Sequence, residues 1–275
     1  GDSYLSVTKA LMHSAISADR KLNIIWIEAG MLEDATLAED PSSHSDAWAK
    51  LHSVDGILVP GGFGERGTEG KILTAKYARE NKVPFLGICL GMQAAVIEYA
   101  RNVLGNKSAH STEMVPECAD PAVIFMPEGS TTHMGGTMRL GARRTFFQTQ
   151  DCKAAKLYNS PPFIDERHRH RYEVNPDMVD KLEAAGCVFV GKDETNRRME
   201  ILELESHPFF LATQYHPEYK SRPGRPSPPF MGLILAASGQ LDRYITTEAI
   251  EMRINAPGGF IQSPLKALKR LNNTM

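Results

Sequence analysis

The stretch of sequence that decides the fold is Pro84-Phe85-Leu86-Gly87-Ile88-Cys89-Leu90-Gly91-Met92-Gln93. Its apolar first half predicts a short buried strand that ends at Ile88, and apolar residues recur at helical spacing from Met92 onward. A cysteine between a strand and a helix, flanked by glycines, is typical of a nucleophile elbow, because small neighbours permit the strained turn that presents the side chain at the carboxyl edge of a sheet. The amino end of the helix also favours the reactive thiolate. An inert buried cysteine is the alternative that this segment alone leaves open.

A second motif supplies the two partners that a cysteine nucleophile needs, a base and a group that orients the base. It is Tyr215-His216-Pro217-Glu218-Tyr219, directly after an apolar run at 209–214 that predicts a strand. If that strand ends at the same edge as the elbow, His216 lies near Cys89 and the Glu218 carboxylate can turn back to fix the imidazole tautomer. A His-x-Glu pair alone is more often a surface turn, so its weight comes from its position relative to the elbow.

A glycine loop, Pro60-Gly61-Gly62-Phe63-Gly64, follows another apolar run at 56–59. The backbone N–H groups of a glycine pair can turn toward a developing negative charge. The loop therefore predicts one oxyanion donor, and the amide of Leu90, next after the nucleophile, predicts the other. A nucleotide-binding loop is the alternative, but neither the G-x-x-x-x-G-K spacing nor a complete G-x-G-x-x-G occurs in the loop.

The first half of the chain alternates apolar runs with helical patterns, as a parallel sheet covered on both faces requires. We therefore expect an α/β fold with an open, mostly parallel central sheet flanked by helices and a small antiparallel flank at 115–150. Acidic, Ser-rich residues 33–46 predict a surface loop. The other predicted elements are strands at 22–27, 123–126, 137–140, 145–149, 187–190 and 199–203, and helices at 3–18, 69–80, 92–103, 178–185 and 228–245.

Composition excludes several classes of protein. The 275 residues are 42% hydrophobic and carry a net charge of −2, from 31 Lys and Arg against 33 Asp and Glu, so we expect neither nucleic acid nor an anionic membrane as a partner. The apolar runs are too short to span a bilayer. The four cysteines form no C-x-x-C pair, and no basic stretch followed by an apolar one opens the chain, which predicts a reducing, cytoplasmic location. Because the chain begins at Gly1, we expect it to be a piece of a longer protein.

A basic run, Arg167-His168-Arg169-His170-Arg171, invites a metal site or a phosphate site. On a strand, both histidines lie on one face, but no cysteine or carboxylate with metal-ligand spacing is nearby, and adjacent arginines repel a cation. We therefore predict no metal ligand in the chain and expect the run to lie at the substrate or at a domain interface, with a solvated charged edge as the alternative.

Together the three motifs resemble the triad-type (class I) glutamine amidotransferases: a P-G-G loop, a G-x-C-x-G-x-Q elbow and a downstream H-P-E. Further stretches narrow the resemblance to the amidotransferase domains of CTP synthases, and it covers roughly residues 1–245. These stretches are residues 61–70 (GGFGERGTEG), 134–141 (MGGTMRLG), 167–175 (RHRHRYEVN) and 221–229 (SRPGRPSPP). The resemblance implies the flavodoxin-like layering of that class.

The resemblance also implies the roles of individual residues. Cys89 would attack the side-chain amide of L-glutamine to form a γ-glutamyl thioester, His216 would pass the proton to the leaving ammonia, and Glu218 would orient His216. Without the resemblance, Glu113 fits a helix-capping carboxylate. The residues implied to bind substrate are Gly62, Leu90, Gly91, Met92, Gln93, Glu113 and Arg171, of which Gly62 and Leu90 would also form the oxyanion hole.

The resemblance implies partners as well. The amidotransferase domain would occupy residues 1–250, followed by a tail at 251–275 that we expect to be mobile. It would need no cofactor itself, since ATP, Mg²⁺, UTP and a GTP activator would act in a synthase domain that this chain lacks, and the complete enzyme would be a homo-oligomer. Two rival readings remain: another cysteine hydrolase on the same scaffold, and a catalytically silent assembly domain, against which the intact triad argues.

Overall fold

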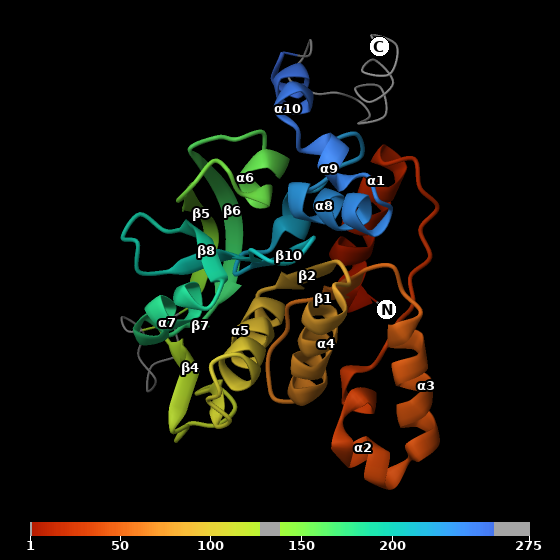
Figure 1. Ribbon diagram of the computed structural model, residues 1–275, viewed down its shortest axis with the longest axis vertical. Coiled ribbons are helices and arrows are strands. Elements are labelled where there is room, and N and C mark those ends of the chain that lie inside the picture. The colour runs from red at the N-terminus through yellow and green to blue at the C-terminus, as the bar shows by residue number, and fades with distance from the viewer. Residues whose placement is uncertain (1, 127–137, 256–275) are drawn as a thin grey trace.

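The computed structural model describes residues 2–126 and 138–255, and a seven-stranded sheet runs through its centre (Figure 1). Only β1, β2 and β10 pair in parallel; every other neighbouring pair of this sheet is antiparallel. The strands follow each other across the sheet as β1 (Ile57–Val59), β2 (Phe85–Ile88), β10 (Phe210–Thr213), β9 (Met199–Leu204), β8 (Cys187–Lys192), β5 (Arg139–Phe147) and β6 (Phe163–His170).

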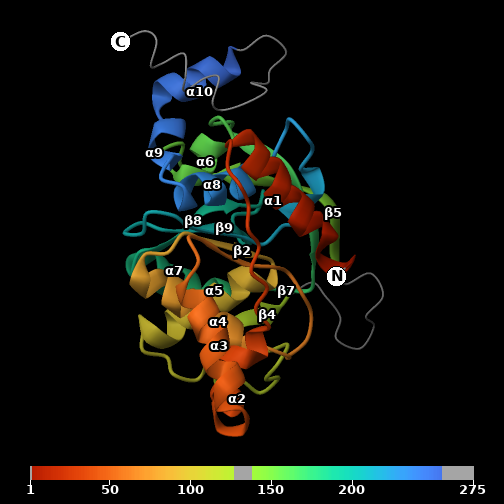
Figure 2. The same ribbon diagram turned by 90° about the vertical axis from the view of Figure 1, so that its right-hand side faces the viewer.

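Helices cover both faces of the parallel part of the sheet, which confirms the expected α/β class (Figures 1 and 2). On β2, Phe85 belongs to the hydrophobic cluster under α4 and α5, whereas Leu86 belongs to the cluster under α1 and α8. Successive strand residues point to opposite faces, so this strand is apolar throughout. The longer helices are α1 (Leu5–Ser17), α3 (Pro41–His52), α4 (Thr68–Asn81), α5 (Leu90–Asn102), α8 (Pro228–Ala237) and α10 (Thr247–Ile254). The shorter ones are α2 (Asp34–Glu39), α6 (Lys153–Leu157), α7 (Val179–Ala184) and α9 (Leu241–Tyr244), with 3₁₀ turns at Asp2–Tyr4, Ala29–Leu32, Pro176–Met178 and Pro217–Lys220.

The antiparallel part is larger than the flank expected at 115–150, and it is divided between two sheets. Strand β4 (Asp120–Phe125) joins β3 (Ala109–Ser111) and β7 (Tyr172–Val174) in a small separate sheet, while β5 extends the central sheet. The two strands predicted at 137–140 and 145–149 thus correspond, over residues 139–147, to one long strand, β5. Its pairing with β6 runs from Arg139 with His170 to Phe146 with Phe163.

Two local predictions were wrong. Residues 22–27 form an extended trace on the outside of the molecule and not a strand (Figure 2); β1, the edge strand of the sheet, pairs only with β2 and not with them. Residues 33–46, expected to be a loop, fall largely in α2 and α3. Helix α3 has a strong local start signal, since Asp40 accepts a hydrogen bond from the Ser43 backbone at 3.1 Å and Pro41 occupies the first turn.

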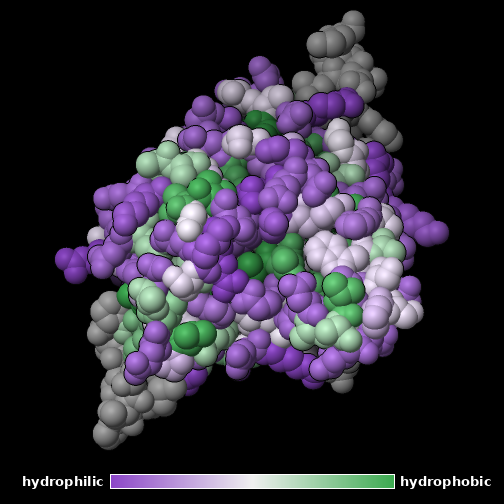
Figure 3. Space-filling model, turned by 60° about the horizontal axis from the view of Figure 1, so that its bottom comes forward, coloured by the Kyte–Doolittle hydropathy of each residue, from purple (hydrophilic) through white to green (hydrophobic). Residues whose placement is uncertain are grey.

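The helix predicted at 228–245 is interrupted: α8 ends at Ala237, and α9 begins at Leu241 after Gly239, whose φ is +68°. Residues 134–137 of one predicted motif and 256–275 of the predicted tail lie outside the described residues, and the tail's first residues belong to α10. On the face shown in Figure 3, hydrophobic residues are scattered among hydrophilic ones. Within the described ranges, no helix combines the length and the apolar character needed to cross a membrane.

Candidate active site

Cys89 lies in the tight turn between β2 and α5. It has φ 52° and ψ −103°, a strained conformation for a residue with a side chain. The turn is held because the Cys89 N–H donates to the Thr213 carbonyl at 2.7 Å. A Cβ on Gly91 would lie 2.2 Å from the Val59 carbonyl oxygen, and one on Gly87 would lie 2.8 Å from the Gly91 backbone. Both elbow glycines are thus required by close backbone packing, and the predicted elbow is present.

His216 and Glu218 follow β10, the strand that pairs in parallel with β2. The two strands end at the same edge of the sheet, as the sequence predicted, since Thr213 is paired with Ile88. The His216 N–H donates to the Arg167 carbonyl at 2.8 Å, and its ring Nδ1 lies 2.8 Å from Glu218 Oε1. Both side chains are buried, so the pair is shielded from water.

The charge state of His216 suits a proton carrier. Burial lowers the pKa of His216, but hydrogen bonds to Cys89 and Glu218 outweigh burial and raise that pKa to about 10. The ring is therefore an imidazolium at neutral pH, and an imidazolium next to the sulfur stabilises a thiolate. Such a pair can supply a nucleophile and the proton that a leaving amine needs.

A Cys89→Ala substitution is expected to lower the pKa of His216, because it removes one of the two hydrogen bonds that raise it. The wild-type ring should stay protonated up to about pH 10, while the ring in the variant should lose its proton at a lower pH. NMR titration of the His216 imidazole measures both values. An unchanged midpoint in the variant would contradict the coupling between the two side chains.

The loop that contains Gly61 and Gly62 packs against Cys89 and His216. A Cβ on Gly61 would lie 2.6 Å from His216 Cε1 and 3.3 Å from Cys89 Cβ, so only glycine fits there. A Cβ on Gly62 would meet Leu90 Cδ2 at an ordinary 3.6 Å. The structure therefore brings the loop and the elbow together, and the oxyanion role of the Gly62 and Leu90 amides stays a prediction.

A cavity of about 160 Å³ opens beside the sulfur of Cys89. Its wall includes five of the predicted site residues: Gly62, Cys89, Gln93, Glu113 and Arg171. Burial raises the pKa of Glu113, while a hydrogen bond from the Gly64 backbone and the charge of Arg171 lower it by less. Glu113 follows β3 and does not cap the helix that precedes it.

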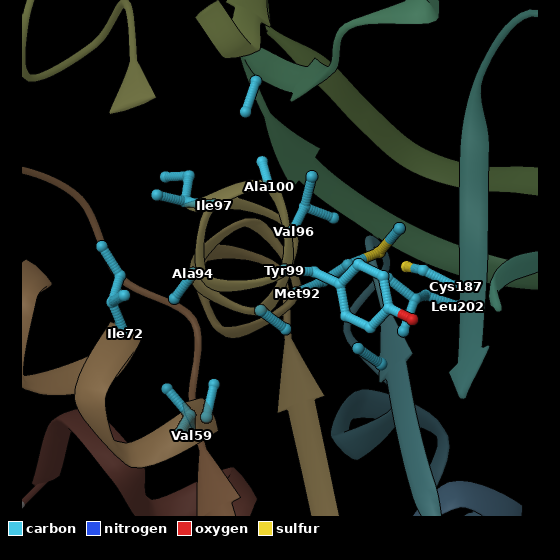
Figure 4. Close-up of a cluster of buried hydrophobic side chains, with 14 of the residues drawn as sticks. Val59, Ile72, Met92, Ala94, Val96, Ile97, Tyr99, Ala100, Cys187 and Leu202 are labelled. Atoms are coloured by element: carbon cyan, nitrogen blue, oxygen red, sulfur yellow. The ribbon is translucent and has the colours of Figure 1, made fainter. Parts of the chain in front are cut away.

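The structure places three predicted substrate residues away from this cavity wall. Leu90 is buried, Gly91 packs its backbone against Val59, and the Met92 side chain belongs to the hydrophobic cluster that packs α5 against the sheet (Figure 4). Any contact of these residues with substrate would therefore have to come from their backbone. Their assignment as substrate-binding residues stays a prediction.

The cavity is also lined by three residues that the sequence analysis did not name as site residues: Phe63, His170 and Tyr172. The alternation in the basic run was the signal for His170, since β6 buries His168 and His170 and exposes Arg167 and Arg169. Burial, and then nearby positive charge, lowers the pKa of His170 to about 3, so this ring is neutral. The described residues hold no group of three potential metal-ligating His, Cys, Asp or Glu side chains.

The other three cysteines lie in different surroundings from Cys89. Cys152 and Cys187 are buried, and burial raises the pKa of each thiol, that of Cys152 to about 12. Cys118 is partly exposed, and its sulfur donates to the Ser108 carbonyl. None of the three lines the cavity beside Cys89.

Comparisons with known proteins agree with this geometry. The family model "glutamine amidotransferase class-I" matches residues 1–236. The chain is 55% identical to CTP synthase 2 of Xenopus laevis over 244 residues, which are 89% of this chain and 42% of that protein. It is also 55% identical over 248 residues to the CTP synthase of Candida glabrata, again 89% of this chain and 43% of that protein.

A solved structure matches almost end to end. The glutaminase domain of Trypanosoma brucei CTPS with bound acivicin superposes with a TM-score of 0.80 at 37% sequence identity, covering 87% of this chain and 89% of that one. By contrast, the chain spans only about two-fifths of the length of the CTP synthases that it resembles. The family match, the superposition and the paired Cys89 and His216 together show that the chain belongs to the class-I glutamine amidotransferase family.

Proposed function

We propose that this chain is the glutaminase half of a CTP synthase, which hydrolyses L-glutamine to glutamate and ammonia. The observation that carries the proposal is the arrangement of Cys89, His216 and Glu218 beside a cavity of about 160 Å³. Relatives that are more than half identical over nearly the whole chain are CTP synthases. They support UTP, and not the acceptor of another amidotransferase, as the molecule that receives the ammonia.

The reaction follows from the charge states of the pair. The Cys89 thiolate attacks the amide carbon of glutamine, and the negative charge moves to the carbonyl oxygen, where the amides of Gly62 and Leu90 donate hydrogen bonds. His216 gives its proton to the amide nitrogen, the C–N bond breaks and ammonia leaves, which forms a γ-glutamyl thioester. A water molecule then gives a proton to His216 and attacks the thioester, and glutamate departs with the thiolate restored.

The charged groups in the cavity suit the head of an amino acid. Glutamine carries one ammonium and one carboxylate, and Glu113 and Arg171 provide one charge of each complementary sign. Arg171 lines the cavity, and its buried Nε has no hydrogen-bond partner among the described residues, a state that a buried polar atom rarely keeps. We assign Glu113 to the α-ammonium and Arg171 to the carboxylate.

The ammonia would be used outside this chain. A synthase domain, normally part of the same polypeptide, would use ATP, Mg²⁺ and UTP to make CTP, with GTP as activator, and the complete enzyme would be a cytoplasmic homo-oligomer. The test is a transfer experiment with glutamine labelled with ¹⁵N at its amide. When this chain is joined to the synthase half of a related CTP synthase, the label should enter the amino group of CTP, and release of labelled ammonia without any labelled CTP would refute the assigned acceptor.

A glutamine analogue with an electrophile on its side chain, such as 6-diazo-5-oxo-L-norleucine, is expected to modify Cys89 alone. Only this cysteine combines the helix amino terminus, an adjacent imidazolium and the substrate cavity. Peptide mapping by mass spectrometry identifies the labelled residue, and excess glutamine should protect it. Labelling of the partly exposed Cys118 with Cys89 untouched would refute the assignment.

A further inference from the structure

A buried glutamine that the triad does not include touches the nucleophile. Gln214 comes directly after β10, and the pairing of Thr213 with Ile88 places it across from Cys89. Its side-chain Nε2 donates to Cys89 Sγ at 3.6 Å, and the side chain is 1% exposed. Its backbone N–H donates to the Glu200 carbonyl on β9 at 2.9 Å. The strands on either side therefore fix this amide against the sulfur.

The orientation of the Gln214 amide follows from a chain of hydrogen bonds. A backbone carbonyl can only accept, so Gln93 must turn its NH₂ group toward the Tyr172 carbonyl, 2.9 Å away. The second hydrogen of Gln93 Nε2 is donated to Gln214 Oε1 at 3.3 Å. Gln214 must then present its own NH₂ group to Cys89. Since both hydrogens of Gln93 are used within the protein, only its Oε1 is left to contact the substrate.

The sulfur of Cys89 has two different neighbours for its two protonation states. A thiol can donate its hydrogen to the Arg169 carbonyl, which lies 3.9 Å from Sγ. A thiolate has no hydrogen to donate, but it accepts from Gln214 Nε2, and a hydrogen bond to a charged atom is stronger than one to a neutral atom. In a site that excludes water, this difference favours the thiolate.

We propose that Gln214 is a positioning residue for glutamine hydrolysis, which holds Cys89 Sγ by its side-chain N–H and stabilises the thiolate that attacks the substrate. The inference rests on the proposed function, in which Cys89 is the nucleophile. The titratable groups around the sulfur are His216 with Glu218 behind it and, in the cavity wall, His170, Glu113, Arg171 and Tyr172. Gln214 adds to this set a neutral donor whose effect does not itself depend on pH.

The test compares Gln214→Met with Gln214→Glu. Methionine has a similar length and no donor, whereas glutamate keeps an acceptor for Gln93 and replaces the N–H beside the sulfur by a carboxylate oxygen. The rate of Cys89 alkylation by iodoacetamide, followed by mass spectrometry across pH, needs no glutamine. We expect half-maximal alkylation about one pH unit higher in Gln214→Met, and higher again in Gln214→Glu. The kcat for ammonia release should fall about tenfold or more in both, with a smaller change in KM.

The matched control is Gln148→Met, which changes an exposed glutamine just after β5 and should leave the alkylation profile and kcat as in the wild type. If both Gln214 variants fold and keep the wild-type profile, the residue only packs and the inference is wrong. If neither variant folds, NMR of the wild-type chain decides: the Gln214 Nε2H₂ signals should shift with the same midpoint as alkylation, and constant signals would refute the inference. A wild-type chain that releases no ammonia would instead refute the proposed function, whatever the variants show.

Discussion

Cys89→Ala and His216→Ala are each expected to lower the kcat of glutamine hydrolysis by about 10⁴-fold or more. The first substitution removes the atom that forms the thioester, and the second removes the proton that ammonia must take with it. Because the two residues act as one unit, the double variant should be hardly slower than either single variant. Steady-state ammonia release, measured on chains of equal thermal stability, gives all three rates.

Glu218→Gln should lose less activity than either of these, since Glu218 orients the ring through one 2.8 Å hydrogen bond and transfers no proton. Cys118→Ala is the matched control, because it removes a partly exposed thiol that does not line the cavity, and it should keep full activity. A Cys89→Ala chain that still hydrolyses glutamine at the wild-type rate would exclude the thioester route.

The positions of Cys89 and His216 at one edge of the sheet were predictable because their signals are local. The elbow needs a strand, two glycines and a helix start within about ten residues, and the structure shows why each glycine is required there. The position of His216 was predictable for a related reason. A residue that directly follows a strand parallel to β2 and next to it lies near Cys89, whatever path the connecting loops take. Both arguments depend on the carboxyl edge of a parallel sheet and on little else.

The elements that were missed depend on partners far away in the sequence. The apolar residues at 22–27 suit a strand, but a strand must also pair with a neighbour, and no local pattern reveals that these residues do not pair with the free edge of β1. The separation of β4 from β5 has the same origin, because strand pairing is set by long-range contacts. The helix at Pro41–His52 was different: Asp40 and Pro41 gave a start signal that the acidic, Ser-rich composition obscured.

The rest of the site was hidden because it is built from backbone atoms and buried amides. The Tyr172 and Arg169 carbonyls carry no side-chain signature, and their contacts with Gln93 and Cys89 exist only once β6 and β7 are in place. Gln214 was the last residue of a predicted strand, yet its contact with the sulfur depends on the register between β10 and β2. Sequence patterns thus predicted which side chains meet at this edge of the sheet, and the fold revealed what holds them.

Gly61→Ala is expected to lower kcat by about 10²- to 10³-fold while the chain stays folded. The new methyl group would lie 2.6 Å from His216 Cε1 and 3.3 Å from Cys89 Cβ, distances that cannot both be kept. Either the loop moves away and takes the Gly62 amide with it, or the imidazole moves away from the sulfur. Loss of one oxyanion donor costs about 10²- to 10³-fold, and loss of the base costs more, so both responses reduce the rate of the chemical step.

Gly30→Ala is the matched control for this prediction, because it makes the same change at a glycine whose Cβ would have no atom within 4 Å. The two variants should unfold at similar temperatures, and only Gly61→Ala should lose ammonia release. The loss should appear in kcat more than in KM, since Glu113, Gln93 and Arg171 keep their places in the cavity. A Gly61→Ala chain with wild-type kcat would contradict the prediction, because the loop could then accept the methyl group without disturbing either the base or an oxyanion donor.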